Sequence, residues 1–542
     1  MTVAARVRSS RAIVTWAMGL VCALSIRAEL CGADTPAKGF KREGLDPRWE
    51  AVLEEFRQPV PGLLKQHKVP GAALALVDDR GIIWAEGFGV TAAKGKTPVT
   101  PDTPFLLGGM SKLVTATAVM LAVQDGLVDL DRPITNYLSD FKVWSRYQEH
   151  PEEHITLRRL LNNTAGLPVE APLGNYFEPS SAVSFEDHVR SIYGQWLVFP
   201  VGQAFQCSNA SSDLAAYIVQ VAAGKSFEQY MKEKVFVPLG MSRSTVDRTL
   251  VLNMKDRAGG HMIGIAKMPA VFPALGGACV YSTARDLARF LQMQISQGML
   301  DGRRILDASL VKLLHTPTGI VQPPDVYYGL GIFIDKRSPE RVNSILWHDG
   351  WGFGFSGLMH WYPEYGIGTV ALSNRLPNPA MSDLGLSLTD RLIKEKLVAR
   401  CFPSFNPDTN HCVGAWWGWP EHKPAPYRPE WRKYCGLYRL RFSAYELEWW
   451  AKLAVLIKGR DEYTPQIKVQ QKDGFLCLTE STFFDLFGIG RHIDQRLQEI
   501  KPGLFSTASG IVLDLTSEVP TWRSYRLEGV KQRAGAEAKV QP

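Results

Sequence analysis

The residues that first suggest chemistry are Lys112 and the glycine three positions before it. The segment 105–118 reads Phe-Leu-Leu-Gly-Gly-Met-Ser-Lys-Leu-Val-Thr-Ala-Thr-Ala and predicts the start of a helix. Residues three apart share one face of a helix, so a lysine can deprotonate a hydroxyl one turn earlier and make it a nucleophile. The position of that hydroxyl is taken by Gly109, which has no side chain. The sequence therefore predicts no acyl-serine at this turn.

Length and composition describe a globular protein of several domains. The chain has 542 residues, of which 45% are hydrophobic and 21% charged, and that length suggests two to four domains. The formal charge of +7 is partly local: residues 1–33 hold four arginines and one glutamate, a net +3 that leaves +4 for the rest. Because no basic run accompanies this excess, we expect no nucleic-acid partner.

The first 33 residues have the features of an export signal. Three arginines before residue 12 precede an apolar run over 12–26 and the small residues Cys31-Gly32-Ala33. The run of 15 residues is shorter than the roughly 20 that span a bilayer, and an uncleaved N-terminal anchor is the alternative. We therefore expect an exported protein, periplasmic or extracellular, with association with the cell envelope left open.

An oxidising compartment makes disulfides plausible for cysteines near and in the C-terminal region. Cys401 and Cys412 are close enough in sequence to close a short loop, and Cys435 and Cys477 both lie among predicted strands. Sequence alone does not determine the connectivity. Cys279 is expected to be buried as a small apolar residue.

Hydrophobic periodicity predicts an α+β domain over residues 34–398. Helical spacing occurs at 46–68, 109–126 (amphipathic), 157–161, 211–223, 227–233, 283–297 and 384–395. Strands are predicted at 72–77, 82–89, 345–348, 357–361 and 367–373, with a hairpin turn at 78–81. Because strands come first and last with helices between them, the sheet must be assembled from both ends of the domain, which favours an antiparallel sheet flanked by helices.

A change of composition marks a second domain. Residues 399–429 are rich in proline and hold three tryptophans in the run 416–420, which we interpret as a linker with an interdomain packing plug. Strand-length segments follow at 436–442, 447–457, 466–471, 475–479, 496–500, 510–516 and 522–527, with a hairpin turn at Asp473-Gly474. They predict a small β-barrel or sandwich over 430–530, followed by a disordered tail at 531–542.

Several motifs occur in an informative order. They are Val69-Pro70-Gly71, the segments 97–103, 128–133 and 155–161, Gly276-Gly277, and the segments 281–288 and 328–331. Over about residues 45–395 this order resembles the class C β-lactamase and esterase branch of the serine β-lactamase and penicillin-binding-protein family. The resemblance implies an α/β (α+β) fold: an antiparallel sheet flanked by helices, plus an all-helical subdomain. The C-terminal strands more weakly resemble the lipocalin-like barrel that some members carry.

The resemblance implies two site elements, one at the start of a helix and one on a loop between helices, each matched in part. The Ser-x-x-Lys element reads Gly109 and Lys112 here. In the Tyr-x-Asn element, at the end of the loop 200–209, Cys207 stands at the position of the proton-carrying tyrosine, and Asn209 is kept. The nucleophile and the proton carrier are therefore both absent.

A third element is implied on a strand at the edge of the site. It is His-x-Gly in this branch of the family, and His348 and Gly350 match it. Backbone N–H groups at Gly109 and near Trp351 would then form an oxyanion hole, which needs no side chain. Losing the nucleophile from such a set removes most of the rate acceleration.

These matches predict a catalytically degenerate member that keeps a cleft for an acyl-amide or peptide ligand. The alternative is an active acyl hydrolase of esterase, D-aminopeptidase or β-lactamase type. It would use Cys207 as a thiol with a lowered pKa, or a water held in the Gly109 gap and activated by Lys112; the plainer interpretation of Cys207 is a small residue in a vacated pocket. A third interpretation is a vestigial cleft beside a β-domain that makes the useful contacts.

Other residues add less. Ser111 points about 100° away from Lys112 around the helix and is not expected to replace the nucleophile. Asn163, where this branch usually has histidine, is interpreted as drift. The segment 150–154 has a metal-like spacing but is interpreted as a solvated loop, and we expect no cofactor and no metal. If the pocket is otherwise preserved, Gly109→Ser should restore ester hydrolysis.

Overall fold

The computed structural model of the chain describes residues 39–376, apart from 46–49, 51–52, 55–56, 146, 175–181, 263–267, 322–325, 337–343 and 364–365, and eight strands between 436 and 531. Several predictions lie outside the described residues. They are the export signal at 1–33, the helix 384–395, the linker 399–429, the strand 447–457, the cysteine side chains expected to pair, and the tail from residue 532.

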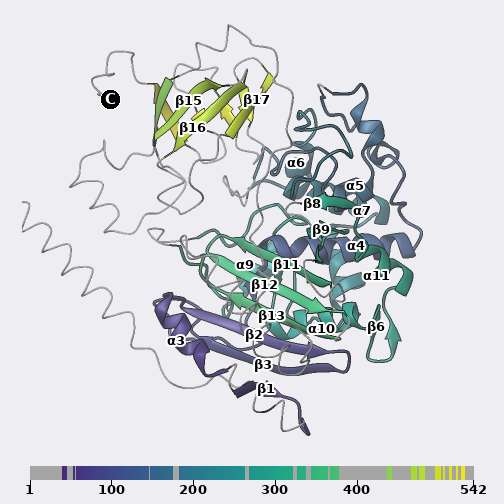
Figure 1. Cartoon of the computed structure of the whole chain (residues 1–542), viewed down its shortest axis with the longest axis vertical. Coiled ribbons are helices and arrows are strands. Elements are labelled where there is room, and N and C mark those ends of the chain that lie inside the picture. The colour runs from purple at the N-terminus through teal and green to yellow at the C-terminus, as the bar shows by residue number, and fades with distance from the viewer. Residues whose placement is uncertain are drawn as a thin grey trace, which may run out of the picture.

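Nine antiparallel strands form the main sheet, in the order β1-β3-β2-β13-β12-β11-β10-β9-β8. Their bounds are β1 (Phe40–Lys41), β2 (Gly71–Asp78), β3 (Gly81–Gly89), β8 (Gly319–Val321), β9 (Val326–Tyr328), β10 (Phe333–Asp335), β11 (Ile345–Gly352), β12 (Phe355–Tyr362) and β13 (Ile367–Ser373). Strand β2 pairs with β13, with Ala72 opposite Ser373, so early and late segments meet in mid-sheet (Figure 1). The prediction that both ends of the domain build one sheet is confirmed.

The sheet has a hydrophobic core on each face. Along β2, Ala73, Ala75 and Val77 join the core shared with the helical part, while Leu74 and Leu76 join the core under α3 (Pro59–Gln66). Successive side chains of a strand point to opposite faces. The apolar run of β2 therefore reflects a strand buried on both sides.

The remaining helices lie mostly between the strands in sequence. They are α4 (Ser111–Gln124), α5 (Leu157–Leu161), α6 (Phe185–Arg190), α7 (Asn209–Ala223), α8 (Phe227–Tyr230), α9 (Arg248–Asn253), α10 (Ala284–Ile295) and α11 (Ala308–Leu314), with 3-10 turns η1 (Gly108–Met110), η2 (Ile134–Asn136) and η3 (Pro151–His154). Helix α10 packs on β2, β3 and β13, and α4 packs on α7 and α11.

Helix α4 departs from its prediction in one respect. Every residue from Ser111 to Ala122 is buried, so the helix is surrounded by protein and is not amphipathic as expected. A helix that is apolar all round is typical of a protein interior. The polar side chains on α4 must therefore find partners inside the fold.

Short elements account for the other differences. Strands β8, β9 and β10 have three residues each, too few to show a period in the sequence. The same holds for the two-residue pairs β4 (Phe105–Leu106) with β5 (Tyr281–Ser282), and β6 (Met299–Leu300) with β7 (Arg303–Arg304). The predicted helix 227–233 continues from α8 into a π-helical stretch, η4 (Met231–Phe236).

The C-terminal strands close into a barrel. They are β14 (Gly436–Arg441), β15 (Gln466–Lys472), β16 (Phe475–Ser481), β17 (Gln495–Lys501), β18 (Leu504–Ser506), β19 (Val512–Asp514), β20 (Thr521–Trp522) and β21 (Leu527–Lys531). Lys472 pairs with Phe475, and the turn expected between them at Asp473-Gly474 lies outside the described residues. The predicted strand 522–527 is wrong: its two ends belong to β20 and β21, and Trp522 pairs with Leu527.

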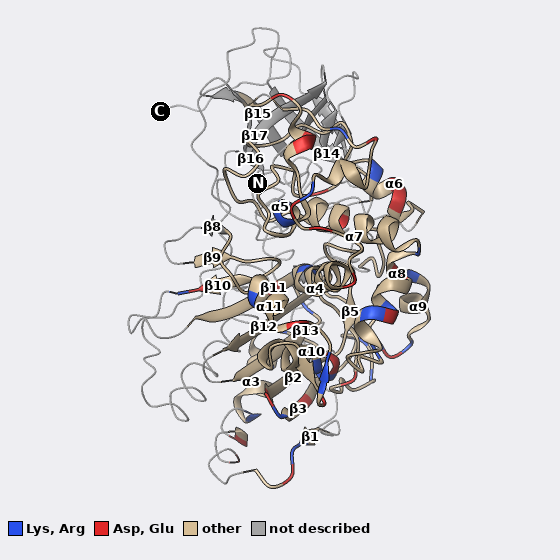
Figure 2. Cartoon of the chain, turned by 90° about the vertical axis from the view of Figure 1, so that its right-hand side faces the viewer, with Lys and Arg blue, Asp and Glu red and all other residues tan. Residues whose placement is uncertain are grey.

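Charged residues of both signs lie close together on the described helices, as Figure 2 shows around α8 and α9. Arg190 contacts Asp140 and Glu186, and Lys225 contacts Glu233. Such exposed pairs contribute little to stability individually. Within the ranges that the structure describes, each helix is too short or too polar to cross a membrane.

Candidate functional site

The 3-10 turn η1, which leads into α4, lies directly against strand β11 at Gly109. A Cβ added to Gly109 would lie 2.9 Å from the carbonyl oxygen of Asp349, 3.3 Å from Cε1 of His348 and 3.7 Å from Cα of Gly350. One added to Gly350 would lie 1.8 Å from the carbonyl oxygen of Leu107. The close approach needs both glycines, because contacts under 3.0 Å force the backbone to move.

This approach bears on two expectations. A Cβ at Gly109 would meet the carbonyl oxygen of Asp349, so that position is not open space. Gly109→Ser would therefore require η1 or β11 to shift. The water proposed as an alternative nucleophile and the gain of ester hydrolysis in Gly109→Ser stay predictions.

His348 is buried and neutral beside this turn. Its Nδ1 lies 2.6 Å from the carbonyl oxygen of Asp349, and its Nε2 lies 3.1 Å from the hydroxyl of Tyr328. A carbonyl oxygen only accepts, so Nδ1 carries the proton and Nε2 accepts from the tyrosine. Burial, with the nearby Lys112 ammonium, lowers the pKa of His348 to about 3. The ring therefore contributes no charge at neutral pH.

Lys112 is a buried amine with two protein acceptors. Its Nζ donates to Oδ1 of Asn209 and, at 3.2 Å, to the carbonyl oxygen of Gly277; the residue is 4% exposed. An ammonium has three donors. Among the described residues the third N–H has no hydrogen-bond acceptor.

Glu170 extends this contact chain. Nδ2 of Asn209 donates to Oε1 of Glu170 at 2.5 Å, while Oε2 of Glu170 is buried with no partner among the described residues. Burial and the Asp213 carboxylate outweigh the Lys112 charge and the Asn209 hydrogen bond, and they raise the pKa of Glu170 to about 7. At neutral pH the site therefore holds a carboxyl group that is only partly ionised.

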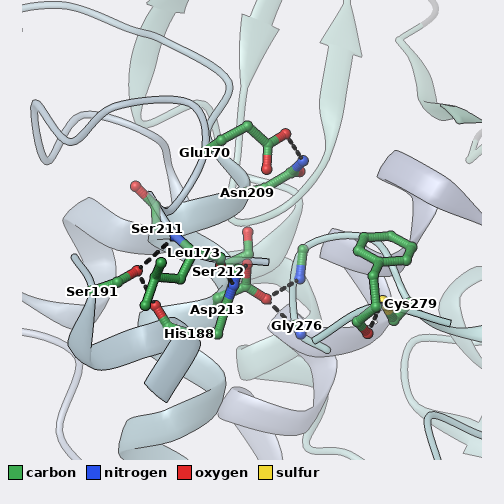
Figure 3. A network of polar contacts seen from close by, with 12 residues as sticks. Glu170, Leu173, His188, Ser191, Asn209, Ser211, Ser212, Asp213, Gly276 and Cys279 are labelled. Carbon is green, nitrogen blue, oxygen red and sulfur yellow. Dashed lines mark hydrogen bonds and ion pairs between the residues drawn. The ribbon is translucent and has the colours of Figure 1, made fainter. Parts of the chain in front are cut away.

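The segment Gly276-Gly277 forms the opposite wall, and side chains satisfy all four of its backbone polar groups. Both N–H groups donate to Oδ1 of Asp213 at 2.8 Å. The carbonyl of Gly276 accepts from Thr115 Oγ1 at 2.8 Å, and that of Gly277 accepts from Lys112. Figure 3 shows Asp213 reaching from α7 to this segment.

Cys207 lies close enough to Lys112 for the ammonium charge to act on its pKa, but it is not an activated thiol. Burial outweighs the Lys112 ammonium and raises the pKa of Cys207. The low-pKa thiolate suggested by the sequence is therefore wrong. Asn163, in the left-handed conformation with φ of 59°, accepts from the N–H of Ser208 and holds this loop, so its side chain has a structural role that drift does not describe.

Two further polar residues border the turn. Ser111 points away from Lys112, and its Oγ accepts from the N–H of Val280 at 3.2 Å. The side chain of Asp349 is 16% exposed. Burial raises its pKa to about 6, and a hydrogen bond to its own backbone N–H and the charge of Lys112 offset this only in part. A second carboxyl group with a raised pKa thus lies on β11, between His348 and Gly350.

The structure brings the predicted site residues together around Gly109. They are Lys112, Cys207, Asn209, His348 and Gly350. Trp351 continues β11, paired with Ser356, and the oxyanion hole implied for its N–H stays a prediction.

Sequence reasoning missed four polar residues of the site. Asp213 lies four residues after Asn209, one helical turn on, and that spacing was a usable signal. Asp349 stands inside the His-x-Gly match. Tyr328 stands inside the matched segment 328–331 but was given no role, and its hydroxyl contacts His348. Glu170 gave no local pattern, because it reaches the site through its contact with Asn209.

Comparisons with known proteins found a matching family model and several similar proteins. The family model described as Beta-lactamase matches residues 50–389. Protein flp of Staphylococcus aureus (strain MW2) is 24% identical over 315 residues, 57% of this chain and 61% of the relative. The unguisins hydrolase ungD' of Aspergillus campestris is 26% identical over 358 residues, 64% of this chain and 65% of the relative. The chain thus spans less than two thirds of either relative.

A solved structure shares the fold. The octameric penicillin-binding protein homologue from Pyrococcus abyssi superposes with a TM-score of 0.54 and 20% identity, covering 88% of this chain and all of that one. At this identity the likeness concerns the fold alone.

We predict that Glu170→Gln changes how stability depends on pH. The raised pKa means that the folded protein keeps a proton which the unfolded chain loses above about pH 4.5, so wild-type stability falls as pH rises through about 7. The variant lacks this loss. Its stability relative to wild type should rise by about 3 kcal/mol between pH 4 and pH 8, since one pKa unit is about 1.4 kcal/mol.

Urea denaturation at several pH values measures this difference. Glu233→Gln is the matched control, because hydrogen bonds from Lys225 and Gln229 lower the pKa of Glu233 and the sign should reverse. A Glu170→Gln difference that does not change with pH would contradict the account.

We predict that Gly109→Ala destabilises the protein by about 1–3 kcal/mol, the usual range for overpacking, because its Cβ meets the carbonyl of Asp349. Gly62→Ala is the control: Gly62 is exposed on α3 with nothing within 4 Å of an added Cβ, and the change should stabilise by about 0.5–1 kcal/mol. Thermal unfolding compares the two. Equal effects would show that β11 yields freely at Gly109.

Proposed function

Because the chain belongs to the beta-lactamase family, whose relatives include hydrolases and penicillin-binding proteins, we propose that it binds an acyl-amide or peptide ligand without forming an acyl-serine. The observation that carries this proposal is the combination of a bare Gly109 with an intact Lys112–Asn209 contact. The chain keeps groups that bind a carbonyl and lacks the group that attacks it.

The third N–H donor of Lys112, which has no acceptor among the described residues, supports ligand binding. Two of its three donors are engaged inside the protein, and the third points to no described acceptor. A buried donor without a partner is unfavourable. The carbonyl oxygen of an amide or peptide would satisfy it, and hydrogen bonds to a charged donor are among the stronger ones.

The state of the neighbouring side chains supports the absence of covalent catalysis. Ser111 is occupied by the backbone of Val280, and Cys207 keeps its proton because burial raises its pKa. His348 is held between Tyr328 and a backbone carbonyl. None of these groups is a ready nucleophile at neutral pH.

We extend the proposal to location and to the second domain. The features of residues 1–33 support action outside the cytoplasm, in the periplasm or extracellularly. The closed barrel β14–β21 is proposed to be the lipocalin-like appendage that the resemblance implies.

A fluorescent penicillin tests the central claim. We expect saturable, reversible binding by fluorescence polarisation and no mass increase of the intact protein after hours of incubation. Lys112→Met should weaken binding at least tenfold because it removes the donor. Lys234→Met, on an exposed ion pair with Asp125, should bind like wild type.

A covalent adduct would overturn the proposal. An adduct that disappears in Cys207→Ser would establish the thiol hydrolase alternative instead. Turnover of an aryl ester without any adduct would point to an activated water.

The binding should weaken as pH rises from 5 to 8. The carboxyl groups of Asp349 and Glu170 have pKa values of about 6 and about 7, so both become negative in this window and repel the penicillin carboxylate. The double variant Asp349→Asn with Glu170→Gln should bind equally at both pH values. Polarisation titrations measure it, and an unchanged pH profile in the double variant would place the titrating group elsewhere.

A further inference from the structure

The wall of the site opposite Gly109 depends on a buried pair of charged side chains on α7 and α6. Asp213 and His188 are both completely buried, and Nε2 of His188 lies 3.1 Å from Oδ2 of Asp213. The other carboxylate oxygen, Oδ1, accepts from the N–H groups of Gly276 and Gly277. Figure 3 shows Asp213 between the imidazole and this segment.

The contacts of His188 determine its protonation. Its Nδ1 lies 2.5 Å from the carbonyl oxygen of Leu173, and its Nε2 faces the carboxylate. Both neighbours are acceptors, so both ring nitrogens must donate, and the ring is an imidazolium. The pKa of His188 moves in the same sense: burial lowers it, but Asp213 and the Leu173 carbonyl outweigh burial and raise it.

From these contacts we infer that Asp213 and His188 form a positioning pair, which holds the Gly277 carbonyl on Lys112 and the Glu170 loop beside Asn209. The inference rests on the proposed function, because it names residues that shape the same ligand site. Among the described hydrogen bonds neither residue contacts Lys112, so both would act through its acceptors.

The packing explains why this segment needs such a holder. A Cβ on Gly276 would lie 2.4 Å from the carbonyl oxygen of Ser212, and one on Gly277 would lie 2.8 Å from Cβ of Asn209. The segment therefore lies flat on the first turns of α7. Asp213 is one turn beyond Asn209, so one helix face presents the residue that binds Lys112 and the residue that anchors its second acceptor.

The same pair reaches the other side of the site. His188 fixes the carbonyl of Leu173, whose N–H donates to Oγ of Ser191 at 3.1 Å. Leu173 lies three residues after Glu170 on one loop. The acceptor set of Lys112 and the carboxyl group beyond Asn209 are thus tied to a single ion pair.

The variant Asp213→Asn distinguishes the hydrogen bonds that residue 213 makes from the charges of the Asp213–His188 pair. The amide oxygen can keep both N–H groups of the glycine segment, while its NH₂ group donates to Nε2 of a neutral His188 that retains only its Nδ1 proton. All the hydrogen bonds survive and both charges vanish. Asp213→Ala removes the acceptor and leaves two buried N–H groups unpaired.

The first readout is the protonation of His188, observed by NMR of the full-length protein with 15N-labelled histidine and assigned with His188→Gln. At pH 7 we expect both ring nitrogens of wild-type His188 to carry protons. In Asp213→Asn, Nε2 should show the shift of an unprotonated nitrogen and Nδ1 should not change. A neutral wild-type ring would overturn the inference, and this measurement needs no ligand.

The second readout is the affinity for the fluorescent penicillin. Asp213→Ala should weaken binding at least tenfold, Asp213→Asn should recover it to within about threefold of wild type, and Asp256→Ala, on an exposed ion pair with Arg243, should have no effect. Equal losses in the alanine and asparagine variants, or no loss in either, would refute a positioning role. If the wild type binds no probe, the proposed function fails while the protonation result still tests the pair.

Discussion

The burial of one ammonium group is the constraint around which this site is built. A charged amine removed from water must be given acceptors, or it destabilises the fold. Helix α4 is enclosed on all sides, so the acceptors for Lys112 come from the start of α7 and from a backbone segment that crosses it. Those acceptors need their own support, which is supplied by Glu170 on one side and Asp213 on the other. These contacts are made without any side chain at position 109.

The backbone is closely packed at the position of the missing side chain. Strand β11 approaches η1 until the Asp349 carbonyl lies where a Cβ would clash. Gly350 allows this approach from the strand side, as Gly109 allows it from the helix side. Close packing leaves few voids inside a protein, so a vacated side-chain position tends to be filled by its neighbours.

The charge around Lys112 depends on pH, because two carboxyl groups near it titrate close to neutral pH. Glu170 and Asp349 both have raised pKa values, about 7 and about 6, because burial disfavours their charged forms. The His188–Asp213 pair cancels its own charge. The balance near Lys112 therefore shifts toward negative as the pH rises. A ligand without a carboxylate beside Asp349 suits this environment better than an anion.

The sequence by itself determined the strands that form the centre of the sheet, the helix carrying Lys112, and the residue types at five site positions, because apolar periodicity and motif spacing are local properties. It also determined that position 109 has no nucleophile. Only the tertiary structure decided that Asp349 fills the space beside Gly109, that Cys207 keeps its proton, and that Glu170 and Asp213 share the site. These depend on loops distant in sequence and on burial, which sets pKa values and acceptor sets that no local pattern encodes.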